Sequence, residues 1–268
     1  MSPQPALPEV DSWPQPSERL VIVIGRGHSA TRAISRQIHQ AGAWMGQNRN
    51  ASEDCPQPFA PMYSAARSAG RLSRHLGDAR WDFSSLVDGP IPMEARGALW
   101  SFLRPLWNAP ADAPACAWKL PETCFVYPWL VRLFPEARFL WWVRDPRDVI
   151  MKDHGTDRLD EWGVKTGLPR ENNYTHVQRA YSWLYQEQVV SQTPSPRHLL
   201  RVRMEDWCRD QAAVNREVTD FIGLPVRTLV VRSGRIGRWR GLTRQINRWS
   251  ECIELLTPAM RRHGYIEG

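Results

Sequence analysis

The chain has 268 residues, of which 42% are hydrophobic and 24% are charged, a composition typical of a globular protein rather than a disordered or membrane-embedded one. Its net charge of +7 favours an anionic partner, such as a nucleotide, a nucleic acid or an anionic membrane. No apolar run has the length of a membrane helix, so no transmembrane segment is expected. Five cysteines without a C-x-x-C pair fit reduced thiols.

Residues 1–18 differ from the rest of the chain. They contain five prolines and neither a basic start nor an apolar stretch, so they lack the pattern of a signal peptide. We expect a flexible N-terminal extension there and a single domain over residues 19–268. Without an export signal, the protein is expected to be cytoplasmic.

The first predicted elements are a strand, a glycine loop and a helix. Residues 19–25 form a short β-branched run that ends at glycine, which is typical of a buried parallel strand. From Ser29 the apolar spacing becomes helical, with Ile34 and Ile38 on one face and Gly42 as a C-cap.

Residues 45–113 alternate short helical patterns with proline-rich breaks, and we expect loops and helices around a pocket there rather than a sheet. Further strands are predicted at residues 115–120, 138–143 and 199–203. Helices are predicted at residues 126–134, from Pro146 through Met151, at 176–190 and at 210–222. The alternating order of strands and helices predicts an α/β fold with a central parallel sheet.

The loop at residues 25–31 is a candidate phosphate site. A strand that enters a helix through a short glycine loop leaves the first helical N–H groups free to bind an anion. Gly25 and Gly27 allow the backbone to approach an anion closely. The hydroxyls of Ser29 and Thr31 can donate hydrogen bonds to it, and Arg26, His28 and Arg32 add positive charge. The loop is not a Walker A sequence, which requires glycine and lysine where Ala30 and Thr31 stand. The alternative is a purely structural turn.

A second candidate anion site follows the strand at residues 138–143. Arg144 stands where this strand ends, so its guanidinium can emerge at the carboxyl edge of the sheet, where open α/β folds bind ligands. The alternative is a surface ion-pair cluster of Arg144, Asp145 and Arg147. Residues 227–248 add seven arginines and no acidic residue, which indicates either a further anion site or a nucleic-acid patch.

Three segments together resemble the sulfotransferase family. G-R-G-H-S-A-T-R at residues 25–32 resembles the loop that holds the 5′-phosphosulfate of 3′-phosphoadenosine 5′-phosphosulfate (PAPS). F-P-E-A-R-F-L-W-W-V-R-D-P-R-D-V at residues 134–149 resembles the strand and helix start that bind its 3′-phosphate, and residues 231–240 resemble the family's late arginine, glycine and tryptophan motif. The resemblance implies a three-layer α/β sandwich of the P-loop NTPase-like sulfotransferase type, and transfer of a sulfuryl group from PAPS by in-line displacement.

The resemblance also implies which residues bind the donor: Arg26, Gly27, His28, Ser29, Ala30, Thr31 and Arg32 at its phosphosulfate, and Arg144, Lys152, Arg232, Ser233 and Gly234 at its 3′-phosphate. The chain departs from the family pattern at three of these positions. His28 and Ala30 stand where relatives have a basic residue and a glycine, and Lys152 stands where they have a serine. A family member that has lost activity is therefore an alternative.

The catalytic residues implied by the resemblance lie at two places. Lys119, at the end of the strand at residues 115–120, matches a lysine that relatives direct at the reacting group, and His28 is expected to act there too. The acceptor hydroxyl must lose a proton to a base. Residues 48–54 resemble the base-bearing loop of several relatives, with Asp54 as the first choice and Glu53 as the second. His154 is a third candidate, whose alternative is a solvated helix residue.

The expected partners follow from the same resemblance. The acceptor is a small molecule, a glycan or a lipid, and no nucleic acid is expected. No metal is implied, because the protein's own cations suffice and no metal-binding acidic strand follows the loop. One rival is a P-loop kinase of a small metabolite, which the missing Walker lysine disfavours, and another is a non-catalytic nucleic-acid binder that uses residues 227–248. The oligomeric state is left open.

Overall fold

The computed structural model describes residue 13 and residues 19–169, 171–227, 234 and 236–267. Within these residues, the central sheet has four parallel strands in the order β4–β1–β5–β6. They are β1 (Leu20–Ile24), β4 (Cys116–Lys119), β5 (Arg138–Val143) and β6 (His198–Arg203). Because all four strands run the same way, their carboxyl ends lie at one edge of the sheet.

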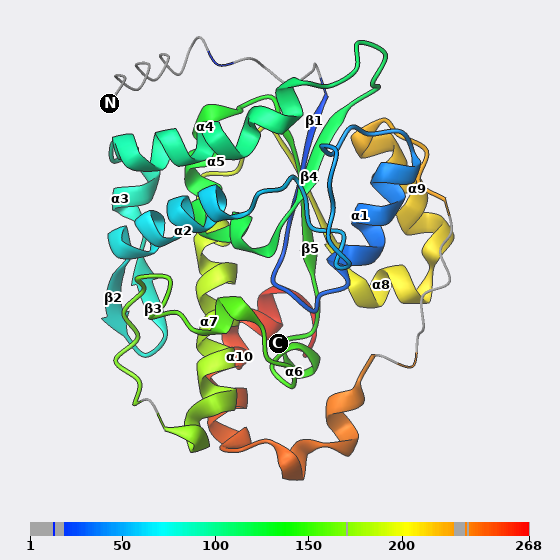
Figure 1. The fold of residues 1–268 in the computed structure, drawn as a ribbon. Coiled ribbons are helices and arrows are strands. Elements are labelled where there is room, and N and C mark those ends of the chain that lie inside the picture. The colour runs from blue at the N-terminus through cyan, green and yellow to red at the C-terminus, as the bar shows by residue number, and fades with distance from the viewer. Residues whose placement is uncertain (1–12, 14–18, 170, 228–233, 235, 268) are drawn as a thin grey trace.

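Helices cover both faces of the sheet and complete a three-layer sandwich (Figure 1). One face carries α1 (Thr31–Gln40), α8 (Met204–Arg209) and α9 (Gln211–Ile222). The other side holds α2 (Ala60–Leu72), α3 (Ser84–Val87), α4 (Met93–Trp107), α5 (Tyr127–Leu133), α7 (Thr175–Ser191) and α10 (Trp249–Arg262). The short α6 (Pro146–Val149) follows the carboxyl end of β5.

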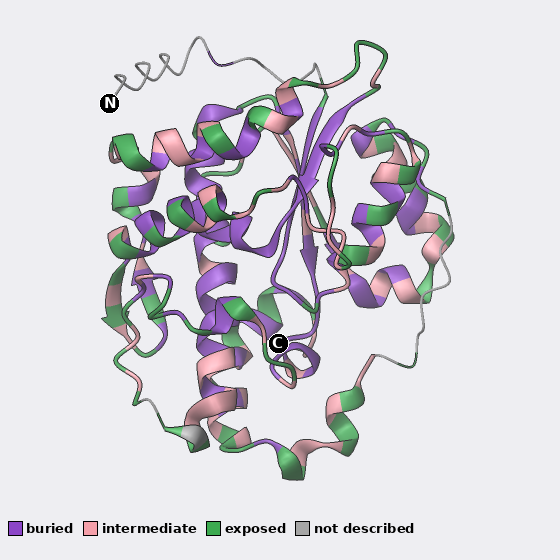
Figure 2. Ribbon diagram, viewed as in Figure 1, coloured by how far each residue is buried: buried purple, intermediate pink, exposed green. Residues whose placement is uncertain are grey.

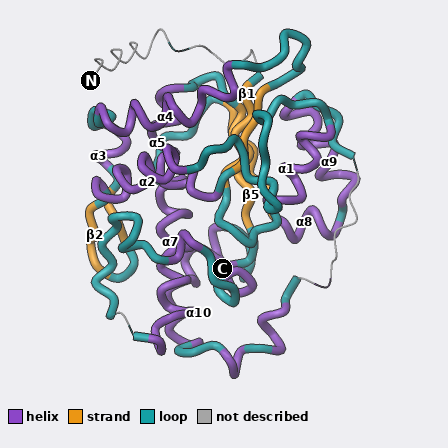
Figure 3. The backbone as a smooth tube through the Cα atoms, in the orientation of Figure 1, coloured by secondary structure: helices purple, strands orange, loops and turns teal. Residues whose placement is uncertain are grey.

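Short 3₁₀ segments connect several of these elements. They are η2 (Pro121–Val126), η3 (Gly155–Asp157), η4 (Asn172–Tyr174), η6 (Arg238–Gly241) and η7 (Thr243–Gln245). Figure 3 shows that β1 and β5 lead into loops at the carboxyl edge of the sheet.

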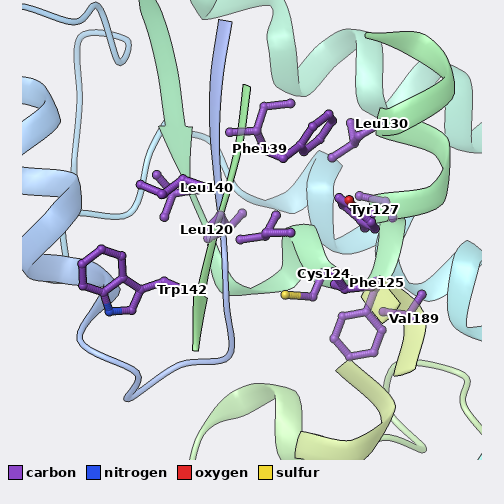
Figure 4. Packing of buried hydrophobic residues seen from close by; sticks show 14 of the residues in the cluster. Leu120, Cys124, Phe125, Tyr127, Leu130, Phe139, Leu140, Trp142 and Val189 are labelled. Carbon is purple, nitrogen blue, oxygen red and sulfur yellow. The ribbon is translucent and has the colours of Figure 1, made fainter. Parts of the chain in front are cut away.

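The strands are apolar on both sides because helices cover both faces. Every residue of β1 is buried, as the purple strands in Figure 2 show. Side chains alternate along β5, so Phe139 points to one face while Leu140 and Trp142 point to the other (Figure 4). All three are buried, and each large apolar side chain taken out of water contributes about 1.5–3 kcal/mol.

Most of the elements predicted from the sequence are confirmed. The α/β class, the central parallel sheet and its four strands agree with the sequence pattern, and α1, α5, α7 and α9 begin and end close to the expected residues. The helix from Pro146 is shorter than predicted, because α6 ends at Val149 rather than continuing through Met151. Two further helices, α8 and α10, were not predicted.

The expectation that residues 45–113 contain no sheet is wrong in one place. The strands β2 (Arg74–Gly77) and β3 (Arg80–Asp82) pair as an antiparallel hairpin. Its two turn residues, Asp78 and Ala79, both have positive φ, of 48° and 55°. Such turns are usually marked by Asn-Gly or Asp-Gly, so Asp-Ala carries little of the usual signal.

The structure describes one residue of the segment that was expected to be a flexible extension. Trp13 is buried and lies edge-to-face against Trp100 and Trp107 of α4, with ring centroids 5.3 and 6.2 Å away. Among the described helices, none combines the length and the apolar character that crossing a bilayer requires.

Candidate functional site

The glycine loop leaves β1 at the carboxyl edge, directly beside β5. A Cβ atom on Gly25 would lie 2.5 Å from the backbone carbonyl oxygen of Trp142, and one on Gly27 would lie 2.2 Å from the His154 ring. Both distances are too short for a side chain, so glycine at these positions allows the loop to pass between β5 and the segment that follows α6. The close packing gives the loop a defined path.

The loop ends at the N-terminus of α1. His28 and Ala30 both have φ of 68°, and Ala30 is the N-cap without offering a side-chain cap. The first N–H groups of α1 therefore have no side-chain acceptor from the capping residue, which suits binding of an anion there. Ser29 and Thr31 are buried beside this helix end. Arg32 is exposed and donates to the hydroxyl of Ser52, 3.0 Å away.

Arg26 lies inside the protein rather than at the surface of the loop. Its side chain is 2% exposed and forms an ion pair with Asp157, and it also donates to the carbonyl oxygens of Gly27 and Val149 at 3.0 and 3.4 Å. Burial lowers the pKa of Arg26, while the negative charge of Asp157 raises it. Since Asp157 balances its charge, Arg26 fixes the loop to the segment after α6. The sequence had suggested a direct contact with the anion.

Two histidines, His28 and His154, lie edge-to-face beside the loop, with their ring centroids 5.6 Å apart. His28 is exposed, and its Nε2 lies 2.7 Å from the carbonyl oxygen of Asp153, which can only accept, so Nε2 carries a proton. Although the residue is exposed, loss of water where its ring packs against the loop lowers the pKa of His28. The positive charges of Arg26 and Lys152 add to the effect, and the Asp153 carbonyl opposes it. At neutral pH, His28 is thus mainly uncharged, whereas the sequence had suggested a cation.

His154 is not a solvated helix residue, so that interpretation is wrong. It follows the end of α6 and its ring lies against Gly27, with Nδ1 accepting from the backbone N–H of Thr156 at 3.2 Å. Burial of its ring first, and then the positive charge of Arg26, lower the pKa of His154 to about 3. The ring is therefore neutral and cannot take a proton from an acceptor at neutral pH.

Arg144 joins the glycine loop to the segment after β5. Its Nη1 donates to the carbonyl oxygen of His28 at 2.9 Å, and its Nη2 lies 3.3 Å from Asp148. The Asp148 carboxylate in turn accepts from the backbone N–H groups of Gly237 and Trp239, at 2.8 and 3.1 Å. Three segments that are far apart in the sequence thus converge on one ion pair at the carboxyl edge of β5.

The remaining residues predicted at the 3′-phosphate are less well defined. Gly234 is exposed, while Arg232 and Ser233 lie outside the described residues. The Lys152 side chain is exposed, and its carbonyl oxygen accepts from Arg26 at 3.4 Å. In the described part of the late segment, the ring centroid of Trp239 lies 4.3 Å from the Arg147 guanidinium.

The structure brings the predicted catalytic residues Lys119 and Asp54 together. Residue 55 forms an isolated bridge with Lys119, which holds the loop at residues 48–54 against the carboxyl end of β4. The Nζ atom of Lys119 forms an ion pair with Asp54 Oδ1 and donates to the carbonyl oxygen of Ser52 at 2.8 Å. The other oxygen, Asp54 Oδ2, accepts from Asn50 at 2.8 Å. Both carboxylate oxygens of Asp54 are therefore engaged.

Glu53 points away from this pair. Its carboxylate lies 3.0 Å from Arg36, which is on α1, and 2.7 Å from Arg49. Its backbone φ of 58° turns the chain between the two neighbouring acids, so the two side chains take different directions. The structure therefore does not bring Glu53 together with Lys119.

Comparison with known proteins identifies the family. A sequence model described as the sulfotransferase family matches residues 10–228, which is most of the chain. The chain belongs to the sulfotransferase family. No curated protein resembles it closely enough to count as a match.

Two solved sulfotransferase structures have a similar fold. The sulfotransferase domain of the olefin synthase from Synechococcus PCC 7002 has a TM-score of 0.51 and 14% identity, over 90% of this chain and 94% of that one. Sulfotransferase STF9 from Mycobacterium avium has a TM-score of 0.47 and 13% identity, over 94% of this chain and 78% of that one. At 14% identity, the likeness to the olefin synthase domain supports the fold of this chain and nothing further. The likeness to STF9, with its lower TM-score, does not strengthen that support.

Sequence reasoning about this sulfotransferase missed Glu122. This residue follows Lys119 by three positions, at the start of η2, and is 5% exposed. Burial raises the pKa of Glu122 to about 7, the charge of Asp54 adds to the rise and the charge of Lys119 opposes it. The sequence shows that Glu122 follows Lys119 closely, but it does not show that the Glu122 side chain is buried.

Proposed function

We propose that this sulfotransferase moves a sulfuryl group from PAPS to a hydroxyl group of a small-molecule, glycan or lipid acceptor. The observation that carries the proposal is the 2.9 Å hydrogen bond from Arg144 Nη1 to the carbonyl oxygen of His28. It joins two anion-binding segments at the ends of neighbouring strands, β1 and β5. A nucleotide with a phosphosulfate on one side of its ribose and a phosphate on the other needs two such segments.

The proposed phosphosulfate site is the N-terminal end of α1. Free backbone N–H groups and the hydroxyls of Ser29 and Thr31 would donate to its oxygens, and Arg32 would add positive charge. Arg26 contributes by holding the loop in place through Asp157. The one ring proton of neutral His28 is donated to the carbonyl oxygen of Asp153, so His28 would donate to the phosphosulfate only after this hydrogen bond is exchanged.

The proposed 3′-phosphate site is formed by Arg144 and Lys152, together with the late segment that includes residues 232–234. Asp148 keeps Gly237 and Trp239, which follow these residues in the chain, near Arg144 by accepting from their backbone N–H groups. Lys152 would supply charge where relatives have a serine hydroxyl, with less fixed geometry because its side chain is flexible.

The proposed reaction is an in-line displacement at sulfur. The acceptor oxygen forms a bond to sulfur while the bond from sulfur to the 5′-phosphate oxygen breaks, and the departing phosphate takes the electron pair. The positive charge of Lys119, at the carboxyl end of β4, would stabilise the oxygens as charge moves to the leaving group. The acceptor proton must pass to a carboxylate near Lys119.

Binding of the product nucleotide tests the proposal. Thermal-shift titration with adenosine 3′,5′-bisphosphate should raise the melting temperature, and ATP with magnesium should raise it much less. A small-metabolite kinase predicts the opposite order. A nucleic-acid binder predicts salt-sensitive affinity for DNA or RNA without preference for the 3′-phosphate, and either result would remove the proposal.

The acceptor can be found without guessing its structure. Incubation of the protein with sulfur-radiolabelled PAPS and an extract of the host, followed by isolation of the labelled product, identifies the group that receives the sulfuryl. Label in an alcohol or sugar hydroxyl is the expected outcome, and label on nitrogen would correct the acceptor class.

A further inference from the structure

The strongest unexplained feature near the site is a buried carboxylate. In the part of the chain that the structure describes, Glu122 Oε2 has no hydrogen-bond partner, although the atom is buried. The carboxylate instead accepts a hydrogen bond from its own backbone N–H. A buried polar atom without a partner is costly, and in folded proteins it usually indicates a function or a bound group.

Glu122 lies close in the chain to Lys119, which the proposed function directs at the reacting group. It is the second residue of η2 and follows Lys119, the last residue of β4, by three positions, and α2 packs against η2. The negative charges of Glu122 and Asp54 both raise the pKa of Tyr63 on α2, after the larger effect of burial. Glu122, Asp54 and Tyr63 are therefore near enough to influence one another's charge, and Asp54 is in contact with Lys119.

Asp54 is less suited to accept a proton than Glu122. One oxygen of Asp54 is held by the ammonium of Lys119 and the other by the amide of Asn50. Proton transfer to Asp54 would break a buried ion pair, which carries a large penalty because it leaves the ammonium unbalanced. Glu122 has a carboxylate oxygen free to accept, and no ion pair has to be broken.

We propose that Glu122 is the general base that takes the proton from the acceptor hydroxyl, and that Asp54 is a positioning residue that holds Lys119. This inference rests on the proposed function. The acceptor O–H bond breaks as its oxygen bonds to sulfur, the proton goes to Glu122 Oε2, and the electron pair of the broken S–O bond leaves with the 5′-phosphate. Protonated Glu122 then returns the proton to water.

The charged surroundings of Glu122 are compatible with this role. Its titratable neighbours are Lys119 at the end of β4, Asp54 from the preceding loop, Tyr63 on α2 and Cys124 on η2 itself. Among the described residues, no charged group of β1, α5 or α7 contributes to the shift of its pKa, although these elements also pack against η2. A base works best when its pKa is near the working pH, and Glu122 meets that condition.

The test compares Glu122→Gln with wild type at several pH values. The substitution keeps the size of the side chain and removes the proton acceptor. The rate of transfer of labelled sulfuryl from PAPS is measured with host extract as the source of acceptor and, in parallel, with water as the acceptor. We expect this rate to be about 100-fold lower in Glu122→Gln than in wild type, within the usual range for loss of a general base. The wild-type rate should rise as pH passes through 7, and the variant should lose that rise.

Two matched variants separate a base from a structural role. Glu161→Gln makes the same chemical change in an exposed ion pair with Arg158 and should leave the rate unchanged. Asp54→Asn should slow transfer about tenfold while it keeps the pH dependence, since general-base removal costs more than loss of a positioning contact. If Asp54→Asn lost the pH dependence and Glu122→Gln kept it, the two roles would be reversed.

The outcomes also distinguish this inference from the proposed function. Affinity for adenosine 3′,5′-bisphosphate, measured by calorimetry, should be the same in wild type and Glu122→Gln within about twofold. No binding by wild type would overturn the proposed function itself. Binding by both proteins with equal rates would overturn only the role of Glu122. Binding by wild type without release of label to extract or water at any pH would overturn the proposed transfer, and the role of Glu122 with it.

Discussion

The guanidinium of Arg144 donates to the backbone carbonyl oxygen of His28 across 2.9 Å, although the two residues are 116 positions apart in the chain. The same guanidinium forms an ion pair with Asp148, 3.3 Å away. One side chain thus holds the glycine loop and the end of β5 together. Substitutions of Arg144 should therefore affect both the proposed donor site and the fold around it.

Replacement of Arg144 by alanine should therefore abolish binding of adenosine 3′,5′-bisphosphate. The change removes a proposed phosphate ligand and leaves the carboxylate of Asp148 without its ion pair, and loss of one partner from a buried pair costs about 3–5 kcal/mol. Calorimetry measures the affinity, and urea denaturation the free energy of unfolding. The control is Arg197→Ala, which removes an exposed arginine. Unchanged affinity in a folded Arg144→Ala protein would remove the assignment of this arginine.

Gly27→Ala should disturb the loop. The new Cβ would lie 2.2 Å from the His154 ring, so the ring or the loop must move, and such overpacking typically costs about 1–3 kcal/mol. We expect a lower melting temperature and weaker bisphosphate binding. Gly155→Ala is the matched control, because a Cβ there has nothing within 4 Å. Equal melting temperatures for the two variants would contradict the packing of His154 on Gly27.

Asp157→Asn should destabilise the protein strongly. Arg26 is buried and its charge is balanced by Asp157, so the amide leaves a buried guanidinium uncompensated, at a cost of about 3–5 kcal/mol. Urea denaturation measures the change in the free energy of unfolding. Glu136→Gln breaks an exposed pair and should change that quantity by less than about 1 kcal/mol. A small effect of Asp157→Asn would mean that Arg26 is solvated.

Glu122→Gln should make the protein more stable at alkaline pH. Folding raises the pKa of Glu122 from its ordinary value of 4.5 to about 7, so the folded state disfavours the charged form and wild-type stability falls as pH rises from 4.5 through 7. The amide does not ionise, so it should exceed wild type above pH 7 by an amount on the order of 3 kcal/mol. Urea denaturation at pH 5 and pH 8 measures this difference, and an equal difference at both pH values would contradict the buried carboxylate.

Local patterns in the sequence were sufficient for the layered fold. The β-branched run before Gly25 and the apolar spacing after Ser29 predicted β1 and α1, because period and glycine punctuation are properties of neighbouring residues. The apolar run at residues 138–143, followed directly by Arg144, likewise predicted that this arginine would emerge at the carboxyl edge of the sheet. In each of these cases the information lies within about ten residues, so no long-range contact was needed to read it.

Only the tertiary structure decided how the side chains of the site are used. Arg26 turns inward because Asp157, 131 residues later, supplies its counter-charge. His154 is neutral because its half-buried ring packs against Gly27, and the carboxylate of Glu122 has a raised pKa because α2 covers η2. Burial and ion pairing depend on which distant segments pack together, and these contacts set the direction and the charge of a side chain that sequence spacing can only place on an element.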